Sequence, residues 1–136
     1  MRVSRQSLFL ALVIAAVVAA VAAALLVLGP PREQRARRMD ERRVDDLAAI
    51  GRATDLYWSR HGKLPASLGE LAPDVGSALA TRDPETEQPY EYRVTGAEQY
   101  ELCARFQQPS ARPSGIFWSH PAGTHCFALE VRKVTR

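Results

Sequence analysis

Two cysteines and two histidines in the C-terminal third of the chain are the residues whose types could carry chemistry. Cys103, His120, His125 and Cys126 would supply zinc ligands, or a thiol beside a histidine base. Adjacent strand residues point to opposite faces, so His125 and Cys126 cannot readily serve one ion, and the sequence contains no CxxC or HxxxH pair. We therefore predict a non-enzymatic protein, with no catalytic residue, no metal site and no cofactor.

A disulfide is the better interpretation of the cysteines. Cys103 is in phase with Glu101 and Arg105, and Cys126 is in phase with Glu130 and Arg132. Both cysteines therefore alternate with the apolar rows of the predicted strands and point away from the core. If these strands pair antiparallel with the cysteines opposed, their Cβ atoms lie near the separation that a disulfide needs. The bond would close a loop of about 22 residues and contribute on the order of 3 kcal/mol in the chain-entropy model. Two unbonded thiols are the alternative.

The remaining conspicuous side chains have structural explanations. His61 lies on the apolar side of a predicted helix at its C-terminal end, where we expect it to pack as an end cap and not to act as a catalyst. Core or loop packing accounts for the aromatic residues Trp58, Phe117 and Trp118. Cross-strand ion pairs on a solvated sheet face account for the alternating charges Glu91, Arg93, Glu101 and Arg105.

Period-two alternation of apolar residues predicts three strands that position the cysteines. The apolar rows are Tyr90, Tyr92 and Val94; then Tyr100, Leu102, Ala104 and Phe106; then His125, Phe127, Leu129 and Val131. The turn at residues 95–98 makes the first two strands a hairpin, and a loop over residues 107–123 leads to the third. We expect one antiparallel three-stranded sheet.

A helix over residues 32–61 is predicted to cover this sheet. Its apolar residues recur at steps of three and four: Val44, Leu47, Ile50, Thr54 and Tyr57, with Ala48, Gly51 and Trp58 beside them. Gly62 fits a left-handed C-terminal cap, and Pro65 prevents the helix from resuming soon after it. The pair Ser67 and Glu70 matches a capping box for a further short helix. The fold class is α+β, two layers around one core.

The longest apolar run, residues 8–28, predicts a transmembrane helix. It contains only Leu, Ala, Val, Ile and one Phe, and at about 1.5 Å per residue it spans roughly 32 Å, close to the thickness of a bilayer. Gly29-Pro30-Pro31 should end or kink this helix. The alternative is a cleaved signal peptide, for which Ala20-Val21-Ala22 offers a small-x-small cleavage site.

Small residues on this helix offer a face for another helix. Ala15, Ala19 and Ala23 recur every fourth residue, a small-xxx-small pattern on which a second helix could pack closely. They are candidates for self-association or for binding a protein partner within the bilayer.

Charge is distributed unevenly along the chain. Of 18 basic residues, eight lie up to Arg43, whereas 12 of the 15 acidic residues lie after it, so the C-terminal part is slightly acidic and we expect no nucleic-acid partner. The arginine collar after residue 28 would by the positive-inside rule place this part in the cytosol, and the cysteine pair argues for the opposite side. We favour the side outside the cytosol. The predicted organisation is a tail (1–7), a transmembrane helix (8–28), a proline break with an Arg-rich juxtamembrane segment (29–43) and a small domain (44–136).

A family resemblance rests on short motifs in order. They are the apolar N-terminal helix, Asp45-Asp46-Leu47-Ala48-Ala49-Ile50 with Tyr57, Gly62-Lys63-Leu64-Pro65-Ala66-Ser67-Leu68 with Leu71, Asp83-Pro84, and Pro89-Tyr90-Glu91-Tyr92. Over roughly residues 44–106 the chain resembles type IV pilins and type II secretion pseudopilins, above all the major pseudopilin. The resemblance implies a pilin-like fold, a bacterial inner-membrane location with a periplasmic domain, and filament assembly through the membrane helix.

The sequence departs from that family where filament subunits are processed. No Gly precedes Leu8 as a prepilin peptidase site, no acid lies within the apolar helix, and the acidic calcium-binding loop of the major pseudopilin is absent from the sequence. We therefore expect a single-pass, membrane-anchored, pseudopilin-like protein that binds or scaffolds a partner. A diverged filament subunit and a secreted domain with a cleaved signal peptide are the alternatives.

Overall fold

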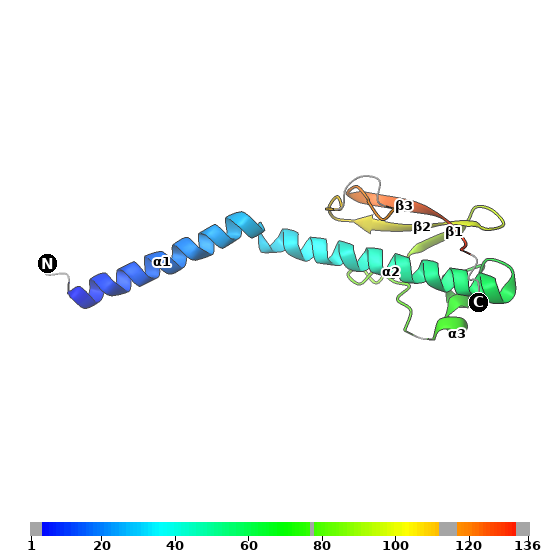
Figure 1. Cartoon of the computed structure of the whole chain (residues 1–136), viewed down its shortest axis with the longest axis horizontal. Coiled ribbons are helices and arrows are strands. Elements are labelled where there is room, and N and C mark those ends of the chain that lie inside the picture. Colours follow the sequence, from blue (N-terminus) through cyan, green and yellow to red (C-terminus); the bar gives the residue numbers. More distant parts are fainter. Residues whose placement is uncertain (1–3, 77, 112–116, 133–136) are drawn as a thin grey trace. The chain divides into compact units, whose positions relative to one another are not determined.

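The computed structural model describes residues 4–76, 78–111 and 117–132. The order of elements is α1 (Arg5–Leu28), α2 (Pro31–His61), a 3-10 turn η1 (Leu68–Leu71), α3 (Ala72–Val75), β1 (Glu91–Val94), β2 (Gln99–Phe106) and β3 (Gly123–Glu130) (Figure 1). The chain divides into two compact units, Met1–Arg35 and Ala36–Arg136. This α+β layout, with a long apolar N-terminal helix and a three-stranded antiparallel sheet, is the one the sequence predicts.

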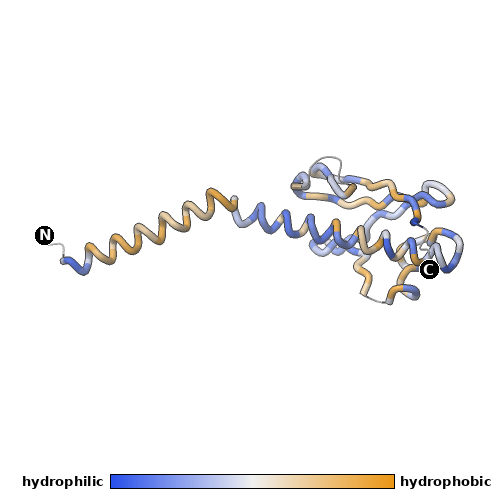
Figure 2. Tube along the Cα trace, in the orientation of Figure 1, coloured by the Kyte–Doolittle hydropathy of each residue, from blue (hydrophilic) through white to orange (hydrophobic). Residues whose placement is uncertain are grey.

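Helix α1 is apolar on all sides. The Ser4 hydroxyl caps its start by accepting from the Ser7 amide at 3.2 Å, and Figure 2 shows hydrophobic colouring along nearly its whole length. All of its side chains are exposed, among them Leu26 and Val27 at 86% and 84%. A helix with no polar face has no partner for that surface in water, which is the pattern of a membrane span or an apolar targeting helix.

The proline break separates α1 from α2 as predicted. Gly29 adopts φ +75°, a conformation that favours glycine, and α2 begins at Pro31, where a missing N–H costs no helical hydrogen bond. At the other end, Gly62 adopts φ +68° and its amide donates to the Trp58 carbonyl at 2.8 Å. The predicted end of the helix is thereby confirmed.

The capping box after α2 does not form. The Ser67 side chain makes no capping hydrogen bond. The Glu70 carboxylate accepts instead from the Ala66 amide at 3.0 Å and from the Tyr57 hydroxyl at 3.0 Å. Glu70 therefore joins this turn to α2 through Tyr57, a tertiary contact that the local capping motif does not predict.

The sheet has the order β1-β2-β3, with both pairs antiparallel. One face lies along α2 in Figure 1, and the core forms between them. Of the predicted apolar rows, Val94 is the exception, because it is 47% exposed at the end of an edge strand. The buried core consists of Val44, Leu47, Ile50, Ala53, Tyr57, Leu71, Tyr90, Tyr100, Leu102, Ala104, Phe106, Phe127 and Val131.

The disulfide is confirmed. Cys103 lies directly opposite Cys126 in the β2–β3 register, and their sulfur atoms are bonded. The predicted ion pair between Arg93 and Glu101 also joins β1 to β2, at 3.1 Å.

Candidate functional site

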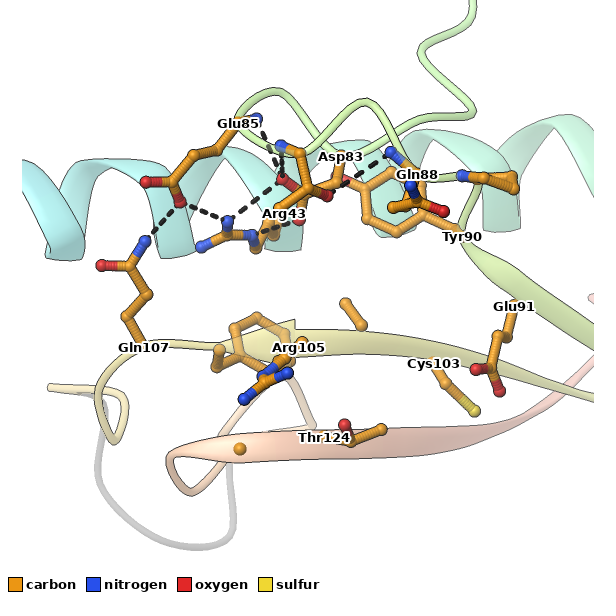
Figure 3. Close-up of a pocket in the computed structure, with 15 residues that line it drawn as sticks. Arg43, Asp83, Glu85, Gln88, Tyr90, Glu91, Cys103, Arg105, Gln107 and Thr124 are labelled. Atoms are coloured by element: carbon orange, nitrogen blue, oxygen red, sulfur yellow. Dashed lines mark hydrogen bonds and ion pairs between the residues drawn. The ribbon is translucent and has the colours of Figure 1, made fainter.

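The most deeply buried charge of the described residues is Arg43 on α2. Its side chain is 2% exposed and contacts three carboxylates, of which Figure 3 shows those of Asp83 and Glu85. Nε and Nη2 form a bidentate pair with Asp83 at 2.5 and 3.1 Å, Nη1 donates to Asp40 at 2.8 Å, and Nη2 also donates to Glu85 at 2.7 Å. We call Arg43 with Asp40, Asp83 and Glu85 the arginine clamp. Because it is buried and paired, it fixes the 83–85 turn to α2.

The contacts within the clamp shift the pKa values of Arg43 and Asp83. Burial alone would raise the pKa of Asp83, but hydrogen bonds from Arg43 and from the amides of Glu85 and Thr86 outweigh it and lower that pKa to about 2. Burial opposes charge on Arg43 too, yet its three carboxylate partners raise the Arg43 pKa above the ordinary value. Arg43 and Asp83 are therefore both charged at neutral pH.

Asp40 extends the clamp to the end of β2. Its carboxylate accepts from the Gln107 amide at 3.0 and 3.1 Å and from the Gln108 amide at 2.9 Å. The Gln107 side chain also donates to Glu85. One helix residue thus satisfies two backbone donors at the point where the strand leaves the sheet.

An open slot of about 840 Å³ lies beside the clamp (Figure 3). Arg43, Asp83 and Glu85 of the clamp, together with Tyr90, form one wall, and β2 from Cys103 to Phe106 forms the other. Figure 3 shows Glu85 and Gln107 at one end and Glu91 at the other. The Tyr90 hydroxyl donates to Asp46 of α2 at 2.8 Å, so this wall is attached to the helix at a second point.

Backbone direction makes β2 an open edge in this slot. Cys103 and Cys126 have their Cα atoms 4.0 Å apart, the close spacing of an antiparallel pair that exchanges no backbone hydrogen bonds. The Cys103 amide and carbonyl therefore face β1, where Glu91 is its partner. By the two-residue period, the amide and carbonyl of Arg105 face the same side.

No strand residue of the described chain lies opposite Arg105 on that side, because the β1–β2 register ends at Glu91 and Cys103. Continuing it would bring position 89 opposite Arg105, and Pro89 has no amide hydrogen to donate. Pro89 pairs instead with Arg82 in an isolated bridge, and the Tyr90 amide donates to the Thr81 carbonyl at 3.0 Å. A proline thus directs the chain away from β2 and leaves Arg105 open between Glu91 and the Asp40-capped Gln107.

The residues first considered for chemistry do not converge on this slot. The disulfide uses both cysteine sulfur atoms. His120 is buried and stacks on Phe106 with ring centroids 3.6 Å apart, whereas His125 meets the Phe127 ring edge-on. Ala15, Ala19 and Ala23 are exposed on α1.

The other residues predicted to be structural are placed as follows. His61 is exposed and packs against Tyr57 with the two rings tilted by 32°. Its Nε2 lies 3.0 Å from the Asp74 carboxylate, so His61 packs at the helix end while remaining accessible. Trp118 is half-buried and packs on Phe127 at 4.9 Å, and Phe117 is 51% exposed.

The sequence pattern does not identify Arg43 as a buried residue, because Arg43 falls within the predicted Arg-rich juxtamembrane segment. The compact C-terminal unit includes the chain from Ala36 onward, and Ala36, Asp40 and Arg43 continue the buried face of α2 toward its N-terminus. The signal was present, because these three residues fall at steps of three and four before Val44. It was hidden because two of the three are charged.

By length and composition, the N-terminal helix is apolar enough to cross a membrane, a property that signal sequences near N-termini share. Comparisons of the chain with protein-family models, with curated proteins and with solved structures gave no match.

Proposed function

We propose that this chain is a single-pass membrane protein of the bacterial envelope, pseudopilin-like, whose C-terminal domain lies outside the cytosol and binds or scaffolds a protein partner without catalysing a reaction. The observation that carries the proposal is that one chain contains both a fully exposed apolar helix and a domain with a buried core. Every side chain of α1 is exposed, with no polar face, whereas the domain after it has its own core. An apolar helix next to an independently packed domain suits an anchor that displays a domain.

The disulfide supports the location outside the cytosol. Cys103 and Cys126 are bonded, and such bonds persist in oxidising compartments but are rare in a reducing cytosol. The long α2 packed on a small antiparallel sheet also agrees with the layout implied by the pilin resemblance. It keeps a subunit of a pilus or secretion filament as a second candidate function.

Crosslinking in intact cells, followed by purification of the full chain, separates the two functions. A discrete adduct with one foreign protein supports the scaffold. A ladder of self-adducts through the N-terminal helix would favour the filament. If crosslinking yields neither in the compartment where the protein resides, the partner-binding function is wrong.

A further inference from the structure

We propose that the slot beside Arg105 binds an extended, cationic peptide segment of a partner protein, which adds to the open edge of β2. This inference rests on the proposed function, since it names the chemistry by which the domain would hold its partner. We expect an extended backbone as the occupant because the groups left open, the Arg105 amide and carbonyl, are those that pair with a neighbouring strand.

The open position has the donor and acceptor that a new strand needs. The Arg105 amide and carbonyl face the slot, Glu91 ends β1 on one side, and the Asp40 carboxylate occupies the Gln107 amide on the other. The gap therefore accepts one pair of antiparallel backbone hydrogen bonds. At about 3.4 Å per residue, about three residues of a segment fit along Ala104–Phe106, and the ends of a longer peptide lie beyond the gap.

The walls are held in place before any peptide arrives. Asp83 and Glu85 are bound to Arg43, and Tyr90 is bound to Asp46. A slot whose walls are already fixed avoids the ordering cost that weakens binding to flexible edges. Ala104 and Phe106 give the slot an apolar lining between its charged ends.

Charge selects the side chains of the occupant. The clamp sets one guanidinium against three carboxylates, and Glu85 keeps 47% of its side chain exposed. Glu91 at the other end adds a further carboxylate, and Arg105 is the only other cation among the residues that line the slot. The excess of negative charge favours Lys or Arg on either side of the inserted residue.

The outer edge of β3 is the competing surface. Within the described chain it has no strand partner, and a groove of about 560 Å³ runs beside it, lined in part by Phe117 and Trp118. Its charged residues balance, Arg52 and Arg132 against Asp55 and Glu130, so charge does not select an occupant there. Binding at β3 is therefore an outcome that the experiment must distinguish.

Amide hydrogen exchange of the full chain in detergent micelles tests the open edge first. Along β2, the amides of Glu101 and Cys103 should be protected by β1, and Gln107 by Asp40. Arg105 should exchange at least tenfold faster than its neighbours Ala104 and Phe106, which bond to β3. An Arg105 amide as protected as Ala104 would overturn the proposal, because the position would already be occupied.

Defined peptides then test the occupant. The probes are acetyl-TKVKT-amide, its glutamate counterpart acetyl-TEVET-amide, and a TKVKT peptide with an N-methylated valine. We expect TKVKT to slow exchange at Arg105 at least tenfold at saturation, with much weaker effects from the other two. Equal effects of TKVKT and TEVET would refute the charge selection, and equal binding of the N-methylated peptide would refute strand addition.

Two charge reversals complete the test. Glu91→Lys should weaken TKVKT binding about tenfold, whereas Glu130→Lys, an exposed strand glutamate at the far edge of the sheet, should leave it unchanged. Loss of binding only in Glu130→Lys, or protection of Thr124 and Ala128 in place of Arg105, would assign the peptide to β3 and overturn the proposal. Failure of every peptide, alongside a discrete crosslinked partner, would refute the slot and leave the proposed function intact.

Discussion

Arg43 shows how a charged residue becomes part of a core. An uncompensated guanidinium would cost several kcal/mol to bury, so it is stable at 2% exposure because three carboxylates surround it. Two of these, on the 83–85 turn, lie about 40 positions away in the sequence. The clamp therefore joins separated segments and builds one wall of the slot.

Replacing Arg43 by Met should destabilise the domain by about 3 kcal/mol or more, because Asp40 and Asp83 would be left as buried charges without their cation. Arg42→Met removes an exposed arginine one position away and should change stability by less than about 0.5 kcal/mol. Urea unfolding of the full chain in micelles, followed by tyrosine and tryptophan fluorescence, measures both. Equal and small losses of stability in the two variants would show that the clamp contributes nothing to the stability of the domain.

Protonation of Asp83 in acid should lower the free energy of unfolding of the domain. Its pKa is about 2 in the folded protein and about 3.8 ordinarily, so the unfolded chain binds more protons between these values and stability rises with pH there. The contribution, on the order of 2 kcal/mol, is complete above about pH 5 and is lost as the pH falls through 2.

Comparing Asp83→Asn with the wild type at several pH values isolates this contribution. The variant should be less stable at pH 7, and the difference should narrow as the pH falls from 5 toward 2. Asp45→Asn, an exposed control on α2, should follow the wild-type profile. A difference between Asp83→Asn and the wild type that does not depend on pH would contradict the account.

The disulfide acts at the scale of the elements. It joins β2 to β3 across a sequence separation of 23, so losing it should cost on the order of 3 kcal/mol. We expect the double variant Cys103→Ala, Cys126→Ala to unfold at a lower urea concentration than the oxidised wild type. Adding a reductant should lower the urea midpoint of the wild type to about that of the variant and leave the midpoint of the variant unchanged. Intact-mass analysis that finds two free thiols in the isolated protein would contradict the bond.

Element boundaries were predictable where one physical signal decided them. The Gly29-Pro30-Pro31 break, the glycine cap at Gly62 and the alternation of the strands each act locally, and the structure contains them. The disulfide pairing followed from the same alternation. The slot was not predictable, because it depends on where Pro89 directs the chain and on Asp40 reaching the Gln107 amide, contacts between residues distant in sequence.

At the scale of the whole molecule, the proposed function requires α1 to remain attached as an anchor. The helix presents apolar surface on all sides, which is stable in a bilayer and costly in water. The domain has its own core, so it could also persist without the helix if a signal peptidase removed it. The central claim is therefore that α1 stays attached and holds the domain at the membrane.

Protease treatment of bacterial spheroplasts expressing the full chain, followed by N-terminal sequencing and intact mass of the alkali-washed membrane fraction, tests that claim most directly. Untreated membranes should contain the chain with residues 8–28 intact, and external protease should remove the C-terminal domain and leave a membrane fragment that includes α1. A soluble product beginning near Ala23, or a domain that external protease cannot reach, would contradict the account.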